Sequence, residues 1–196
     1  MDPMSPAPAR TSRDAIVAAA RSILETDGLD ALTMQAVADA VGIRAPSLYK
    51  HVADRAALIR AVTDAIATEL ADALGRPRPT DHPANELRLI ARRYRSFVSA
   101  NPAGYGLLFT KLDPGLKPDD ATLAALGIPI IAATQRLIGE SAALPAARTI
   151  VAWAHGFVSM ELAGAFRLGG DIDAAYVDGL DLILAGISGS ASPPSG

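Results

Sequence analysis

The sequence of 196 residues contains no cysteine, a single tryptophan and only three histidines. The absence of cysteine excludes disulfides, thiolate nucleophiles and zinc fingers, and nothing indicates an oxidising compartment. The histidines, His51, His82 and His155, are scattered and have no partner at metal-ligand spacing. There is also no Gly-rich phosphate loop and no pair of carboxylates with a base nearby. We therefore expect no metal, no cofactor and no enzymatic activity.

Long apolar runs and strong positive charge are missing as well. No uninterrupted apolar run reaches the roughly 18 residues that a membrane span needs. The first ten residues, MDPMSPAPAR, lack the apolar segment of a secretory signal. These absences predict a soluble, cytoplasmic protein with no membrane partner. The net charge is −3, so any nucleic-acid interface must be a local patch.

The sequence is rich in helix formers. It is 50% hydrophobic with abundant alanine, which provides ample material for a core, and no segment alternates strictly. This pattern predicts an all-α fold of about nine helices, with a kink at Gly127 and Pro129. On the fifth helix, Arg88, Arg92 and their arginine neighbours are expected to form a solvated face. We expect the helices near residues 11–27, 33–41, 45–52, 54–74, 85–100, 102–111, 118–139, 145–168 and 171–186.

The stretch from Thr33 to His51 has the pattern of two short helices joined by a tight corner. Thr33 can cap the first helix, Gly42 suits a turn with positive φ, and Pro46 suits a first helical turn. Helix, short glycine turn and helix form the helix-turn-helix pattern, whose second helix lies in the major groove of DNA.

The same region carries a local excess of positive charge. Residues 41–60 hold four basic side chains and one acidic side chain. The alternative to a DNA-binding face is a corner in an ordinary helical domain with a solvated basic surface. The donors that suit phosphate oxygens or base edges are Arg44, Ser47, Tyr49, Lys50, His51 and Arg55.

Residues from about 14 to 58 resemble the DNA-binding domain of the TetR (tetracycline-repressor) family of transcriptional regulators. The matching pieces are AIVAAARSILETDGLDALTM, VADAVGI and SLYKHVADRAALI. The resemblance implies a helix-turn-helix domain over 11–60 and a ligand-binding and dimerisation domain over 61–187. Composition predicts a disordered arm over 1–10 and a disordered tail over 188–196.

The resemblance also assigns roles to individual positions, with two departures from the family pattern. Arg44 stands where Ser or Thr often caps the recognition helix, and because Arg cannot accept a hydrogen bond, this cap is expected to be lost. Val52 stands where Phe is usual. Tyr49 could instead be packed against the core, and His51 could act as a local cap. Carried over by position, phosphate contacts fall on Thr33, Tyr49, His51 and Arg55, and the residues nearest the bases are Arg44, Ala45, Ser47 and Lys50.

A second motif, Trp153-Ala154-His155-Gly156, resembles the Trp-His-Gly signature of one C-terminal subclass of the family. Trp153, Phe157 and Met160 fall on one face of a helix. This face could be core or dimer packing, or it could be the wall of a mostly apolar ligand pocket. The expected pocket residues are Tyr94, Phe97, Tyr105, Leu108, Phe109, Trp153, His155, Phe157 and Met160.

The resemblance further implies a homodimer formed through the eighth and ninth helices, bound to a palindromic DNA operator. It implies a repressor that is released by an unknown small-molecule effector, which is expected to be largely apolar. The alternatives are a helical protein-interaction module and an activator without small-molecule control.

Overall fold

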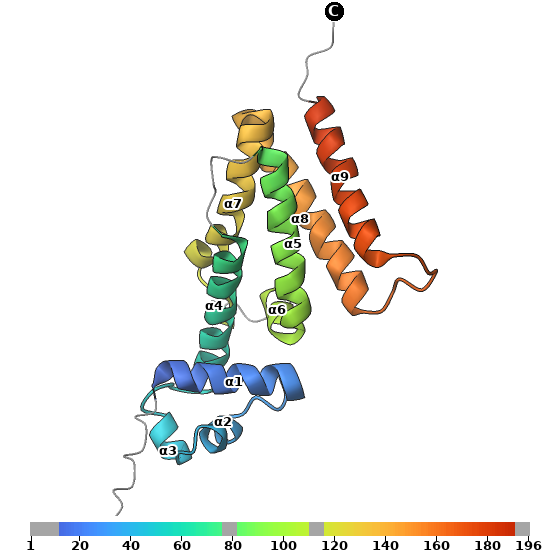
Figure 1. Ribbon diagram of the computed structural model, residues 1–196. Helices are drawn as coiled ribbons and strands as arrows, with labels where there is room; N and C mark the ends of the chain where they lie inside the picture. Colours follow the sequence, from blue (N-terminus) through green and yellow to red (C-terminus); the bar gives the residue numbers. More distant parts are fainter. Residues whose placement is uncertain (1–11, 76–81, 110–115, 191–196) are drawn as a thin grey trace, which may run out of the picture. The chain divides into compact units, whose positions relative to one another are not determined.

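The computed structural model describes residues 12–75, 82–109 and 116–190, and within these ranges the chain forms nine α-helices and no strand (Figure 1). The expected all-α class is therefore confirmed. The segments predicted to be disordered, 1–10 and 191–196, lie outside the described residues. In chain order the helices are α1 (Arg13–Asp27), α2 (Met34–Ala40), α3 (Ala45–Leu48), α4 (Arg55–Leu74), α5 (Pro83–Ala100), α6 (Pro102–Phe109), α7 (Asp120–Ile138), α8 (Glu140–Leu162) and α9 (Ile172–Ser190).

The chain divides into two compact units. The first holds the residues up to Ile66 together with Ala103–Pro118, and the second holds Ala67–Pro102 together with the residues from Asp119 onwards. The division falls inside α4 and assigns α6 to the unit that contains α1, α2 and α3. The predicted boundary after residue 60 differs from this division, since it places α6 in the second domain.

Side-chain caps set the beginnings of three helices in the first unit. The Thr33 hydroxyl accepts from the Ala36 N–H at 3.1 Å, and the Asp54 carboxylate accepts from the Ala57 N–H at 2.7 Å. The cap predicted at Thr33 is therefore confirmed, and Asp54 caps α4 in the same way. Helix α1 is capped by Ser12, whose hydroxyl accepts from the backbone at 3.1 Å, whereas the predicted start at Thr11 lies outside the described residues.

Helix α6 is attached to α1 within the first unit by a carboxylate. The Glu25 side chain accepts from the N–H groups of Ala103 and Gly104 at 3.0 and 2.8 Å. A Cβ at Gly104 would lie 2.6 Å from Cδ1 of Ile66, so the absence of a side chain allows this close approach. Within the first unit, α6 is thus held by Glu25 of α1 and lies close to Ile66 of α4.

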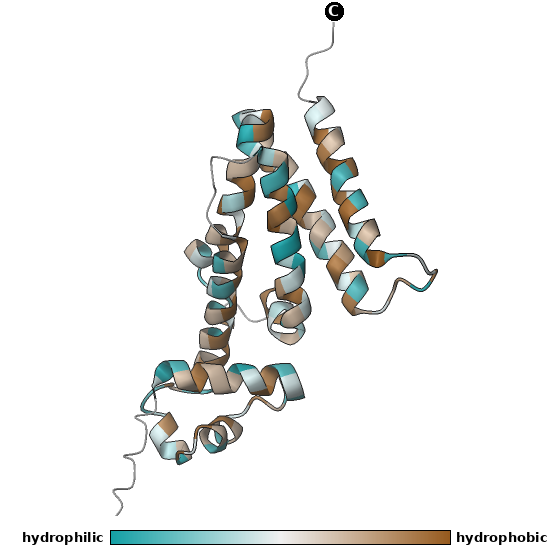
Figure 2. Ribbon diagram, in the orientation of Figure 1, coloured by the Kyte–Doolittle hydropathy of each residue, from teal (hydrophilic) through white to brown (hydrophobic). Residues whose placement is uncertain are grey.

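The second unit contains α5, α7, α8 and α9, and α7 makes its most extensive contacts with α8 and α5. Figure 1 shows α5, α8 and α9 running side by side, and Figure 2 shows hydrophilic and hydrophobic residues interleaved along α5. By length and composition alone, α7 is apolar enough to cross a membrane, with a mean hydropathy of 1.5. Of this apolar stretch, 17% is buried among the described residues.

The predicted bounds of the eighth helix were wrong at both ends. It begins at Glu140, directly after Gly139, so Pro145 lies inside it and not in its first turn. Packing of the neighbouring alanines, which are buried, offsets the lost backbone bond of this proline. The helix ends at Leu162 because Gly164 adopts a φ of 61° and its N–H donates to the Glu161 carbonyl at 2.9 Å.

The ninth helix is capped by Asp171, whose carboxylate accepts from the N–H groups of Asp173 and Ala174 at 2.8 and 3.1 Å. It continues to Ser190, past the predicted end near Gly186. Residues 188–190, which were expected to belong to the disordered tail, are therefore helical.

One arginine fixes the loop between α1 and α2. The Arg55 guanidinium donates through Nε to the Leu32 carbonyl and through Nη2 to the Leu29 carbonyl, each at 2.7 Å. These two carbonyls belong to the segment that leads directly to the Thr33 cap. The first residue of α4 therefore holds the entry to the helix-turn-helix in place.

We expect Arg55→Ala to lower the free energy of unfolding by about 1–2 kcal/mol, because two charge-assisted hydrogen bonds are lost at a partly solvated site. Urea denaturation of the purified protein measures this change. The matched control is Arg60→Ala, since the Arg60 guanidinium only approaches Asp64 at 4.0 Å on the surface, and its effect should stay within about 0.5 kcal/mol. Equal effects of the two substitutions would contradict the structural role of Arg55.

Candidate functional site

The corner between α2 and α3 is closed by backbone hydrogen bonds. The N–H of Gly42, whose φ is 71°, donates to the Asp39 carbonyl at 3.1 Å. The Ile43 N–H reaches back to the Ala38 carbonyl at 3.0 Å. The glycine predicted for this turn is thus in the conformation that glycine tolerates best.

Helix α3 is shorter than the predicted 45–52, because its regular part ends at Leu48. The chain continues as a tight turn in which the N–H groups of His51 and Val52 donate to the Leu48 carbonyl at 2.9 and 3.1 Å. Leu48 and Val52 are buried, at 0% and 5% exposure, and they anchor this segment to the core of the first unit. The residues between them face solvent.

The structure brings the predicted DNA-contacting residues together on the first unit. They come from the start of α2, from α3 with the turn after it, and from the start of α4. Tyr49 is 52% exposed, so about half of its surface is open to solvent. Arg44 occupies the cap position of α3 and forms no side-chain cap, as predicted. The exposed members are Thr33, Arg44, Tyr49, Lys50, His51 and Arg55, and the half-buried members are Ala45 and Ser47.

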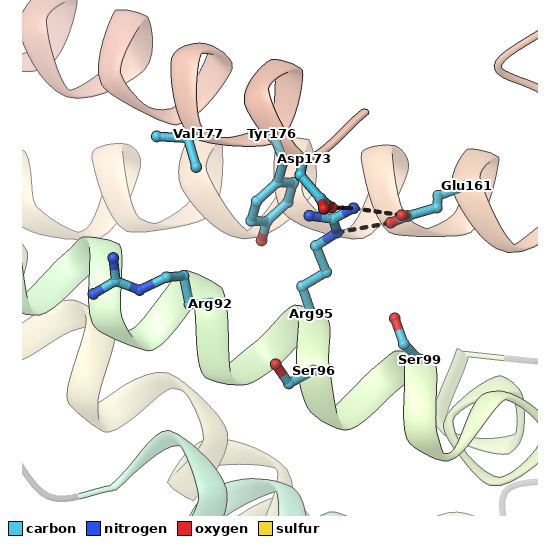
Figure 3. Close-up of a pocket in the computed structure, with 8 residues that line it drawn as sticks. All are labelled: Arg92, Arg95, Ser96, Ser99, Glu161, Asp173, Tyr176 and Val177. Carbon is cyan, nitrogen blue, oxygen red and sulfur yellow. Dashed lines mark hydrogen bonds and ion pairs between the residues drawn. The ribbon is translucent and has the colours of Figure 1, made fainter. Parts of the chain in front are cut away.

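In the second unit, α5, α8 and α9 line an open groove of about 530 Å³ (Figure 3). Its centre is Arg95, whose guanidinium donates to both Glu161 carboxylate oxygens at 2.8 and 2.5 Å and lies 2.7 Å from Asp173. The same guanidinium lies over the Tyr176 ring, 4.9 Å from its centroid. The groove residues are Arg92, Arg95, Ser96, Ser99, Glu161, Asp173, Tyr176 and Val177.

The electrostatics of this groove fix two protonation states. The hydrogen bonds with Glu161 are the largest cause that raises the pKa of Arg95 above its usual range, so the guanidinium stays charged. Burial raises the pKa of the Tyr176 phenol, so the ring stays neutral. The phenol donates to the Ala91 carbonyl at 2.9 Å.

A polar ladder joins α5 to α9. Arg88 pairs with Asp181 at 2.6 Å, Tyr176 donates to the backbone of α5, and Arg95 pairs with Asp173. The expectation of a solvated arginine face on α5 was therefore wrong for Arg88 and Arg95, and also for a third arginine, Arg93, which donates to the Leu74 carbonyl at 3.3 Å. Sequence reasoning missed these pairs because their partners lie on distant helices.

The residues predicted for the ligand pocket are divided between the two units. The three on α6, Tyr105, Leu108 and Phe109, belong to the first unit. The six on α5 and α8 belong to the second: Tyr94, Phe97, Trp153, His155, Phe157 and Met160.

Within the second unit an aromatic cluster surrounds Trp153. Its ring is stacked on Tyr176 with centroids 5.0 Å apart and lies 5.7 Å from Phe157. Phe157 in turn lies 4.8 Å from Phe166. Tyr176 and Phe166 were not among the predicted pocket residues, and Met160, which was, is 49% exposed. Helix α9 approaches closely here, since a Cβ at Gly179 would lie 2.8 Å from the Trp153 ring.

Among the described residues, no group of three or more His, Asp or Glu side chains is arranged to hold a metal ion. What the first unit offers is a set of exposed hydrogen-bond donors on a rigid corner. What the second offers is a groove and an aromatic cluster. A donor-rich corner suits the phosphates and base edges of DNA better than it suits a reaction centre.

Comparisons with known proteins agree with both units. Residues 16–62 match the family described as Bacterial regulatory proteins, tetR family, and residues 87–183 match the Tetracyclin repressor-like, C-terminal domain. The chain is 33% identical over 184 residues to an uncharacterized HTH-type transcriptional regulator of Mycobacterium tuberculosis, which covers 92% of this chain and 83% of that protein. It is also 39% identical over 62 residues to the tetracycline repressor protein class D of Escherichia coli, across 32% of this chain and 27% of the repressor.

Solved structures show the same fold. A protein with unknown function from Rhodococcus sp. RHA1 has a TM-score of 0.76 at 24% identity, covering 94% of this chain and 99% of that one. A TetR variant of Acinetobacter baumannii AYE in complex with minocycline has a TM-score of 0.67 at 22% identity, covering 94% and 100%. Together with the sequence matches over both units, these findings show that the chain belongs to the TetR family of DNA-binding transcriptional regulators, a family without enzymatic activity.

Proposed function

We propose that this regulator is a repressor that binds a palindromic operator as a homodimer and is released by a small molecule. The observation that carries the proposal is the exposed donor surface of the residues that flank α3, where Arg44, Tyr49 and Lys50 are exposed while Leu48 anchors the segment. A surface that is rigid, local and rich in donors fits DNA even in a chain of net charge −3.

Distinct roles follow for the residues of this face. Arg44 and Lys50 project from the two ends of the α3 segment, and each can donate to guanine O6 and N7, with Ala45 and Ser47 nearest the same bases. Thr33, Tyr49 and His51 would contact phosphates. Arg55 would reach a phosphate only with the N–H groups that its two carbonyl partners leave free.

The homodimer would form through α8 and α9. Both helices expose large apolar side chains in the single chain: Leu144 is 44% exposed, Val151 38% and Leu182 75%. Exposed apolar groups on neighbouring helices favour a symmetric helix-to-helix interface. A twofold dimer would present two α3 segments to successive half-sites of a palindrome.

The effector would act on the C-terminal part of the chain, where Trp153, His155 and Gly156 also match the Trp-His-Gly signature of one subclass. We propose a largely apolar effector that contacts the expected pocket residues of the second unit on α5 and α8, among them Tyr94 and Phe157. Its release of DNA requires that it binds the non-DNA-binding conformation more tightly than the other. Function on chromosomal DNA also supports a cytoplasmic location.

The operator proposal predicts the behaviour of an Arg44→Ala, Lys50→Ala double variant. Each residue can supply about 1–3 kcal/mol of base discrimination, so the variant should bind the DNA flanking its own gene at least about 30-fold more weakly. Fluorescence anisotropy across a range of salt concentrations measures the affinity and the number of phosphate contacts. The control is Arg167→Glu, which changes the net charge by the same two units at an exposed position in the loop between α8 and α9.

The control should bind within about threefold of the wild type, because surface charges distant from DNA contribute only screened interactions. A double variant at Arg44 and Lys50 that binds as tightly as the control would contradict the assignment of α3 as the reading element. Binding that is weak, salt-sensitive and unselective in all three proteins would favour a helical protein-interaction module.

The dimer proposal predicts that Leu182→Glu yields a monomer, because a charge would be buried in an apolar interface. Light scattering coupled to size exclusion measures the mass. Leu168→Glu is the matched control, since Leu168 is fully exposed in the loop between α8 and α9, and it should remain dimeric. A dimer that survives Leu182→Glu would place the interface on another surface.

A further inference from the structure

Some polar side chains in the groove between α5 and α9 make no contact that stabilises the fold. Four of its residues, Arg92, Arg95, Ser96 and Ser99, lie on one face of α5 at helical spacing. Arg95 is fully engaged by Glu161, Asp173 and the Tyr176 ring. Arg92, Ser96 and Ser99 form no hydrogen bond or ion pair with the residues that the structure describes, and all three are exposed.

The floor of the groove is already rigid. Tyr176 is held from three sides, by the guanidinium above its ring, by the stacked Trp153 and by the hydrogen bond from its hydroxyl to Ala91. Tyr176 itself is only 2% exposed, so the apolar side chain that a ligand would meet above this rigid support is Val177, which is 45% exposed. A preformed surface lowers the ordering cost of binding.

The groove is also polarised along its length. Figure 3 shows Glu161 and Asp173 converging on Arg95 at one end, whereas the Arg92 guanidinium lies at the other end and points away from them. Arg92 is thus the charged groove residue that forms no ion pair with the described residues. Its neighbour one turn along α5, Ser96, is a second free donor.

From these groups we propose that the groove binds a small organic carboxylate with an apolar tail. The carboxylate would accept from the Arg92 guanidinium and the Ser96 hydroxyl, and the tail would lie on the exposed side chain of Val177. The groove volume of about 530 Å³ is within the usual range for small-molecule sites. Action of this ligand as an effector rests on the proposed function, but binding itself does not.

The proposed dimer would leave this groove open. Val177 lies on the edge of α9 that faces α5, whereas Leu182 is five residues further and about 140° around the helix, at roughly 100° per residue. The two surfaces therefore point in different directions, and the groove remains accessible when α8 and α9 pair with a second copy.

The chain provides its own reporter, because its single tryptophan is stacked on the groove residue Tyr176. Trp153 emission of the purified full-length protein would be titrated with hexanoate, with its neutral counterpart hexanamide and with the cation hexylamine. Isothermal titration calorimetry of the same three compounds detects binding that leaves the emission unchanged. No DNA is present, so the outcome is independent of operator binding.

We expect hexanoate to bind saturably and hexanamide and hexylamine to bind at least about tenfold more weakly, because only the anion forms the charge-assisted contact with Arg92. Arg92→Gln should weaken hexanoate binding about tenfold or more, and Ser96→Ala about threefold. Arg148→Gln, an exposed arginine on α8, is the control and should leave the affinity unchanged.

The proposal is overturned by any of three results. These are no saturable hexanoate binding up to about 10 mM by either method, equal affinity for hexanamide or hexylamine, or an Arg92→Gln variant that binds like the wild type. If hexanoate binds but does not release operator DNA, the site stands and its role as the effector site falls.

Discussion

The attachment of α3 to the first unit is the constraint on which the proposed DNA recognition depends. A helix of four residues is too short to be stable by itself, because nucleation costs more than a few hydrogen bonds return. Its position is instead set by the burial of Leu48 and Val52 and by the backbone bond from Ile43 to Ala38. Arg55 fixes the preceding loop from the other side. Donors on such a segment can be placed precisely although the segment carries little structure of its own.

The second unit is organised around the two faces of α5. One face is buried and apolar, and the other carries the ladder of Arg88, Tyr176 and Arg95 contacts that joins it to α9. Because these contacts are directional, they fix how α9 lies along α5 without using the outer surface of α9. That surface, with Leu182 at its centre, stays available for a partner helix. One helix thereby supports both the groove and the proposed dimer interface.

The features that could be predicted from the sequence are those with local causes. The caps at Thr33 and Asp54 and the turn at Gly42 depend on residues within a few positions of one another, and the missing cap at Arg44 follows from its side chain alone. The hydrogen bonds of Arg55 join residues that are 23 and 26 positions apart in the sequence, and the contacts of Arg95 join residues that are 66 and 78 positions apart. No periodicity signals such pairs. The start of α8 was misplaced because tertiary packing outweighs the local preference of a proline.

The measurement that tests the central claim most directly is a selection of the purified protein against random double-stranded DNA. A twofold regulator that reads bases through α3 predicts enrichment of an inverted repeat whose half-site centres lie about one helical turn, or a multiple of it, apart. Enrichment of unrelated sequences, with no shared motif after repeated rounds, would contradict the account. It would leave the donor face of α3 as a surface without a sequence-specific partner.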